Sequence, residues 1–137
     1  PKNVISDKVE EMITSFNLSE VRKKKARLLS GGMQRRLSIA LALITDPEIL
    51  FLDEPTLGLD VIAHRELWSN IKKIKEKTTI ILTTHYLEEA EALSDRVAII
   101  KKGRIKAIGT VAEILYQTNT SKLEDAFVLL NEEEKTI

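Results

Sequence analysis

Two adjacent carboxylates, Asp53 and Glu54, follow the short apolar run 49–52. Carboxylates at the end of an apolar strand are costly unless they have partners or perform chemistry. Because side chains alternate along a strand, two neighbouring residues can address different objects. One carboxylate can face a hydrated magnesium ion, and the other can orient and deprotonate a water. A pair of helix-capping acids, favoured by Pro55 and Thr56, is the alternative interpretation of the same residues.

A histidine and a glycine pair offer further contacts for an anion. His85 follows the apolar run 79–82, and an imidazole N–H can donate a hydrogen bond to a phosphate oxygen. Ser30, Gly31 and Gly32 precede a strongly periodic helical pattern. A helix N-terminus presents backbone N–H groups and partial positive charge, and glycines let an anion approach closely. A surface histidine and an ordinary helix cap are the alternatives.

The elements that position these residues are helices alternating with short apolar strands. Apolar residues at three- and four-residue steps predict helices, and continuous or β-branched apolar runs predict strands. Strands that alternate with helices imply an α/β layer with a parallel sheet, whose ligands lie beyond the carboxyl ends of the strands. The expected helices are 4–16, 30–45, 61–75, 86–93, 111–116 and 121–131, and the expected strands are 49–52, 78–83, 96–101 and 104–108.

Composition narrows the function classes further. The 137 residues are 43% hydrophobic and 31% charged, which is typical of a globular domain with its own core. Lys plus Arg and Asp plus Glu are 21 each, so bulk charge gives no support to nucleic-acid binding. The absence of cysteine excludes disulfides and thiolate metal sites. The apolar runs are too short to cross a bilayer.

Four short motifs occur in a fixed order along the chain. They are Leu-Ser-Gly-Gly-Met-Gln at 29–34, Ile-Leu-Phe-Leu-Asp-Glu-Pro-Thr at 49–56, Gly-Leu-Asp at 58–60 and Thr-His at 84–85. In this order and spacing they resemble the signature motif, Walker B motif, D-loop and H-loop of the ATP-binding-cassette (ABC) family. Each motif is weak alone, but the ordered set is specific, and the likeness extends over roughly 4–115.

The resemblance implies a fold and its parts. The expected fold is α/β, a partial P-loop NTPase-like parallel sheet flanked by helices. The helical signature subdomain would occupy about 1–45, the catalytic core portion about 46–115 and a C-terminal helical tail about 116–137.

The resemblance also implies residue roles, with ATP and Mg²⁺ as cofactors. Asp53 would hold the magnesium through water, Glu54 would be the general base, and His85 would contact the γ-phosphate. Ser30, Gly31 and Gly32 would bind the γ-phosphate of ATP held by a second nucleotide-binding domain in a head-to-tail dimer. Asp60 would cross toward that second domain, and Gln34 and Asp60 are also expected among the cofactor-binding residues.

One motif of the family does not occur in these residues. None of the five glycines begins a Gly-x-x-x-x-Gly-Lys-Ser/Thr sequence, the Walker A loop that grips the phosphates. We therefore expect the chain to lack the N-terminal half of its domain, to bind ATP weakly and not to hydrolyse it alone. Because the absent half would contribute central strands, apolar sheet surface should be exposed and self-association is expected.

The expected function is the motor of a membrane transporter. The segments 34–37, 56–60 and 123–127 resemble exporter-type cassettes most closely. A transmembrane permease subunit would be a partner and would set the substrate, which places the chain in the cytoplasm on the inner face of the membrane. A DNA-repair head, a ribosome-associated cassette and a non-catalytic interaction fragment are the alternatives. No heptad run supports the first of these, and no nucleic-acid partner is expected.

Overall fold

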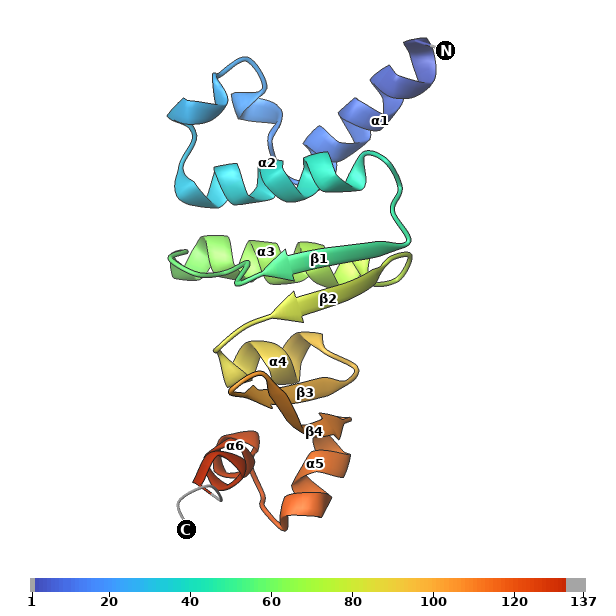
Figure 1. Ribbon diagram of the computed structural model, residues 1–137. Coiled ribbons are helices and arrows are strands. Elements are labelled where there is room, and N and C mark those ends of the chain that lie inside the picture. Colours follow the sequence, from blue (N-terminus) through green and yellow to red (C-terminus); the bar gives the residue numbers. More distant parts are fainter. Residues whose placement is uncertain (1, 133–137) are drawn as a thin grey trace. The chain divides into compact units, whose positions relative to one another are not determined.

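A computed structural model describes residues 2–132 of the chain. Within them, residues up to Thr83 form one compact unit and residues from Thr84 form another, and each is described on its own (Figure 1). The division into three parts expected from the sequence stays a prediction. No helix in the described range is long and apolar enough to cross a membrane.

The first unit opens with two helices joined by short 3₁₀ turns. They are α1 (Lys2–Ser15), the turns Ser19–Val21 and Ala26–Leu28, and α2 (Gly31–Leu43). Helix α2 begins at Gly31 because the Ser30 hydroxyl caps it, accepting a hydrogen bond from the Met33 backbone N–H at 3.3 Å. It ends before Asp46, whose backbone adopts a positive φ of 49° ahead of Pro47. The Lys8 ammonium contacts the Asp46 carboxylate at 2.5 Å and ties α1 to this turn.

A parallel βαβ unit completes the first unit. Strand β1 (Ile49–Asp53) leads through α3 (Val61–Ile74) to β2 (Thr79–Thr83). The two strands pair in parallel, with Asp53 opposite Thr83 at their carboxyl ends. Figure 1 shows both arrows ending on the same side of the small sheet. The predicted parallel sheet is therefore present, and it places the end of β1 beside the end of β2.

One face of this sheet remains apolar and open. Leu50 and Leu52 are buried, whereas Ile49 and Ile81 are exposed and Phe51 is 71% exposed. The strand predicted from the apolar run 49–52 is present, and its buried and exposed residues alternate, so only one face is covered here. The expectation that these residues leave apolar sheet surface exposed is confirmed.

The second unit is built around an antiparallel hairpin. Its elements are α4 (Leu87–Leu93), β3 (Val97–Lys101), β4 (Arg104–Gly109), α5 (Val111–Thr118) and α6 (Leu123–Glu132). The turn between the strands uses Lys102 and Gly103, both at positive φ, as tight hairpins require. Ile99 and Ala107 of the hairpin pack with Ile114, Leu123 and Ala126 of α5 and α6 to form the core of this unit.

A capping box fixes the start of α5. The Thr110 hydroxyl accepts a hydrogen bond from the Glu113 N–H at 3.2 Å, and the Glu113 carboxylate accepts one from the Thr110 N–H at 2.7 Å. The bond from the Thr110 backbone is the main reason why the pKa of the Glu113 carboxyl lies below its usual value; the Thr110 side chain and the charge of Arg96 add to it.

Acidification should remove the contribution of this cap. Because the folded-state pKa of Glu113 lies below its unfolded value of about 4.3, the ionised carboxylate stabilises the fold above that pH. The contribution is lost as the pH falls through the folded-state pKa. We expect urea unfolding between about pH 6 and pH 3 to show a larger loss of stability in the wild type than in Glu113→Gln, which keeps the hydrogen-bond acceptor but does not titrate. Equal losses in the two proteins would contradict this assignment.

Candidate functional site

The carboxyl ends of β1 and β2 bring three polar residues together. The Thr83 hydroxyl donates a hydrogen bond to Oδ1 of Asp53 and accepts one from the backbone N–H of Glu54 at 3.2 Å. The Glu54 N–H also lies 3.0 Å from the Thr83 carbonyl oxygen. A single threonine at the in-register position therefore holds both the side chain of Asp53 and the backbone of Glu54.

The chain turns sharply at Glu54. Its φ is 45°, a left-handed conformation that costs a non-glycine residue on the order of 1 kcal/mol and persists only where the surroundings impose it. The surroundings here include the bonds to Thr83, a turn in which the Leu57 N–H reaches the Glu54 carbonyl at 3.2 Å, and the buried Pro55 and Thr56. Asp53 ends the strand with an exposed side chain, and Glu54 is half-buried, so the two carboxylates occupy different environments.

A second group of predicted residues borders an open depression of about 650 Å³ in the same unit. It is lined by the N-terminal turn of α2 on one side and by the segment leading into α3 on the other. Asp60 thus lies across the depression from Ser30, Gly31 and Gly32. The structure therefore brings the start of α2 and the start of α3, which are far apart in sequence, to one surface.

The α2 side of the depression keeps donors for a ligand. The first N–H groups of a helix have no partner within the helix, and Ser30 serves that of Met33, which leaves those of Gly31 and Gly32. The Ser30 hydroxyl accepts that bond and retains its own proton to donate. The side-chain amide of Gln34 instead donates to the carbonyl of Leu29 at 3.1 Å and more weakly to that of Ala26, so it braces the preceding turn.

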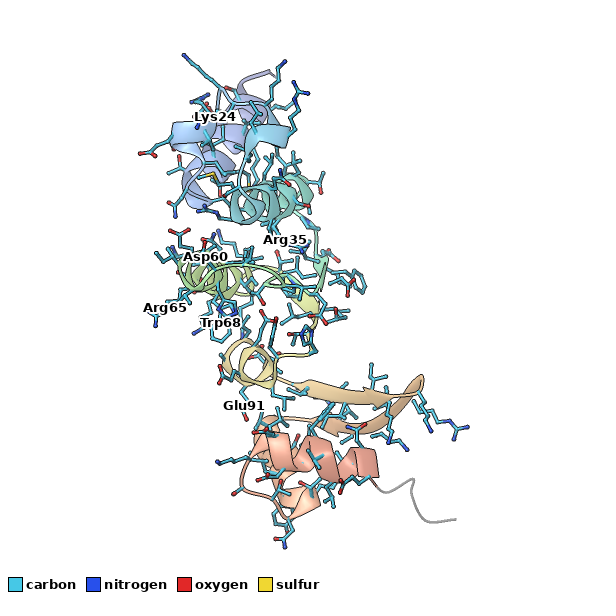
Figure 2. All side chains as sticks on the ribbon, turned by 90° about the vertical axis from the view of Figure 1, so that its left-hand side faces the viewer. Lys24, Arg35, Asp60, Arg65, Trp68 and Glu91 are labelled. Atoms are coloured by element: carbon cyan, nitrogen blue, oxygen red, sulfur yellow. The ribbon has the colours of Figure 1, made fainter. Side chains whose placement is uncertain are left out.

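On the α3 side of the depression, the carboxylate of Asp60 caps the start of the helix. Asp60 accepts hydrogen bonds from the N–H groups of Ile62 and Ala63 at 3.0 and 2.9 Å. Figure 2 shows Asp60 on the side of α3 that faces α2, with Arg65 and Trp68 on the opposite side. Capping accounts for part of what Asp60 does; a contact with a second domain stays a prediction.

The predicted histidine belongs to the second unit. His85 is exposed, and its ring centroid lies 4.1 Å from that of Tyr86. The Thr84 hydroxyl accepts a hydrogen bond from the Tyr86 N–H at 3.0 Å, which shapes the turn before α4. The contact of His85 with a phosphate stays a prediction.

The oxygen ligands at the strand ends are compatible with magnesium. Among residues 2–132 no three His, Asp or Glu side chains gather around one point. Mg²⁺ at phosphate sites usually takes one or two carboxylates and completes its shell with waters and phosphate oxygens. The exposed Asp53, fixed by Thr83, provides one such carboxylate with open space for water.

Three residues at these sites were not foreseen. Thr83 could have been found from the sequence, because it ends the second strand at the position that a parallel register places opposite Asp53. Arg36 and Glu66 both line the depression and form an ion pair of 2.8 Å. They lie on two different helices, and no local pattern indicates that those helices face each other.

Comparisons with known proteins agree with the motifs. A family model described as ABC transporter matches residues 2–57. The chain is 49% identical over 110 residues to ABC transporter A family member 2 of Arabidopsis thaliana, and 42% identical over 118 residues to the daunorubicin resistance ATP-binding protein DrrA3 of Streptomyces coeruleorubidus. These alignments cover 80% and 85% of this chain.

A solved structure of the ATP binding subunit of an ABC transporter is also similar. It superposes on 96% of this chain with a TM-score of 0.83 and 29% sequence identity. This chain spans 56% of that subunit, 37% of the Streptomyces protein and 11% of the Arabidopsis protein. The likeness therefore concerns one part of each larger protein.

Replacing Thr83 should loosen the strand-end site. Thr83→Val removes the hydroxyl that bonds Asp53 and Glu54 while keeping a β-branched shape. We expect a loss of about 1 kcal/mol in the free energy of unfolding, measured by urea denaturation, because one partly exposed hydrogen-bonding group is lost. Thr79→Val, at the start of the same strand, is the matched control and should change stability much less. Equal effects of the two substitutions would show that the hydroxyl of Thr83 has no special role.

Proposed function

Because this chain belongs to the ABC transporter ATPase-domain family, we propose that it is the C-terminal part of a subunit that couples ATP hydrolysis to transport across a membrane. The observation that carries the proposal is the strand end at which Thr83 holds Asp53 and the backbone of Glu54 together. Of two such carboxylates, one can hold a magnesium ion through water and the other can orient and deprotonate the attacking water. The matched proteins named above support transport over the other members of the superfamily.

In this proposal Glu54 is the general base. Its half-buried position and fixed backbone suit a carboxylate that orients the attacking water and accepts its proton. His85 donates a hydrogen bond to the γ-phosphate of ATP. Phosphoryl transfer requires mainly positioning and charge stabilisation from the protein, and these are the contributions proposed for Glu54 and His85.

Asp53 is the residue proposed to hold Mg²⁺ through water. The ion, when bound, neutralises charge on the phosphate oxygens. The hydroxyl of Thr83 donates a hydrogen bond to the Asp53 carboxylate and so keeps it oriented for the ion.

The depression at the start of α2 is proposed to receive ATP held by a second cassette. The N–H groups of Gly31 and Gly32 and the Ser30 hydroxyl suit a terminal phosphate, and Asp60 faces the same surface. Gln34 supports this surface by holding the turn before it. Binding the phosphate would join two cassettes head to tail, and its loss on hydrolysis would release them.

Further partners follow from the family and from the exposed sheet. The open face with Phe51, Ile49 and Ile81 is proposed to pack against an N-terminal half that supplies the Walker A loop. A permease subunit would hold the cassette at the cytoplasmic side of a membrane. One relative is named as a daunorubicin resistance protein. With the motifs at 34–37 and 56–60, this favours an exporter-type cassette.

A chimaera tests this proposal directly. The aligned region of the Streptomyces protein would be replaced by the corresponding residues of this chain, and ATP hydrolysis would be measured. We expect the chimaera to hydrolyse ATP and Glu54→Gln to lower kcat by about 10²–10⁴ without weakening ATP binding, because general-base action is lost. Glu20→Gln, an exposed substitution on a 3₁₀ turn, is the matched control and should retain full activity. If the Glu54→Gln chimaera bound ATP normally and had the same kcat as the unsubstituted chimaera, the assignment of Glu54 as general base would be overturned.

The 137 residues alone should behave differently. They lack the Walker A sequence, so we expect isothermal titration to show weak ATP binding and a coupled assay to show no hydrolysis. Tight binding at one ATP per chain would contradict this expectation.

A further inference from the structure

Helices α2 and α3 meet along two short facing stripes. Gly32 and Arg36 are one turn apart on α2, and Ala63 and Glu66 are one turn apart on α3. A Cβ atom added at Gly32 would lie only 2.9 Å from the Cβ of Ala63. The two helices therefore approach more closely here than a residue with a side chain would allow. One turn further on, Nη1 of Arg36 bonds Oε2 of Glu66 at 2.8 Å.

The close approach explains why Arg36 is buried. Its side chain is only 9% exposed, whereas that of Glu66 is 39% exposed. The Arg36 Nε has no hydrogen-bond partner among the described residues. A guanidinium buried with an incomplete set of partners is not an efficient source of stability, because desolvation offsets much of the gain from the ion pair. Its presence calls for a role other than stabilisation.

The residues of both contacts, Gly32 with Ala63 and Arg36 with Glu66, line the depression. Ser30 and Asp60, which cap the starts of α2 and α3, line the same depression. A shift of one helix along the other would therefore change the spacing between the donors of Gly31 and Gly32 on one rim and Asp60 on the opposite rim. The Arg36–Glu66 pair opposes that shift, because it requires one register of the stripes.

We propose that Arg36 and Glu66 are positioning residues that lock the N-terminal turn of α2 in register with that of α3, so that both turns form one surface for a nucleotide held by a second cassette. The ligand part of this statement rests on the function proposed above. The register part rests only on the contacts within the first unit. Arg36 acts through the backbone of α2 and does not need to touch the nucleotide.

Substitution by an apolar residue of similar length separates positioning from stability. Arg36→Met removes the charge and keeps most of the volume, and it leaves Glu66 partly in water. The test uses the 137-residue chain without nucleotide and follows amide hydrogen exchange by NMR. The reporters are the N–H groups of Met33, Gln34, Ala63 and His64, whose bonds to Ser30 and Asp60 define the two turns. The N–H groups of Glu54 and Thr79 report on the sheet.

We expect Arg36→Met to accelerate exchange at the four reporters by about tenfold while the two sheet amides change little, as local coupling between contacting residues implies. Arg35→Met, on the neighbouring position of the same helix, is the matched control and should leave all six amides unchanged. Combining Arg36→Glu with Glu66→Arg should restore the protection that either single change removes. A uniform change in all six amides, or none, would overturn the proposal.

A second pair of variants tests the close contact. Gly32→Ala should accelerate exchange at the same four reporters, because the added methyl group meets Ala63. At Gly31, in the described part of the chain, an added Cβ meets nothing within 4 Å, so Gly31→Ala should not. Equal effects of the two substitutions would contradict a register set at Gly32.

The hydrolysing chimaera links register to function. In that chimaera, Arg36→Met should lower kcat by about tenfold, and the double substitution Arg36→Glu with Glu66→Arg should restore kcat. An unchanged kcat would overturn the positioning role even if exchange rises. A chimaera without any hydrolysis in its unsubstituted form would count against the proposed function alone, since the exchange experiments need no nucleotide.

Discussion

The close packing of α2 against α3 at Gly32 is the contact on which both candidate sites depend. Helix α3 is the crossover between β1 and β2, so its position affects where the strands end and where Asp53 and Thr83 meet. The same helix begins at Asp60, on the rim of the depression. A side chain at position 32 would separate the helices. A residue with no side chain therefore links the strand ends proposed for hydrolysis to the surface proposed to face a second cassette.

The turn at Glu54 illustrates how strain can serve a site. A left-handed conformation at a glutamate is unfavourable by itself, and it is maintained here by hydrogen bonds from the backbone of Glu54 to Thr83. Those bonds exist only when β2 is paired in register. The geometry of Glu54 therefore reports that the sheet is formed, which ties a chemical group to the completion of folding.

Local patterns predicted most of the elements. The Ser30 cap, the periodicity of 61–75 and the apolar runs were sufficient, because each depends on residues close in sequence. The apolar run also predicted that Asp53 and Glu54 come at the carboxyl end of β1, but Thr83 beside them was not predicted. The facing of α2 and α3 could not be predicted, since it depends on a contact between Gly32 and Ala63 across 30 residues. The burial of Arg36 could not be predicted for the same reason, and because a charged residue on a helix usually lies in water.

The pairing of Asp53 with Thr83 limits where residues can be inserted into or removed from the chain near β2. A slip of β2 by one residue would place an apolar leucine or the next threonine opposite Asp53 and would turn every side chain of the strand to the other face. Insertions can be absorbed in the turn 75–78, which lies outside the ladder, but not within 79–83. The number of residues between the end of the turn and Thr83 is therefore as much a part of this site as the carboxylates themselves.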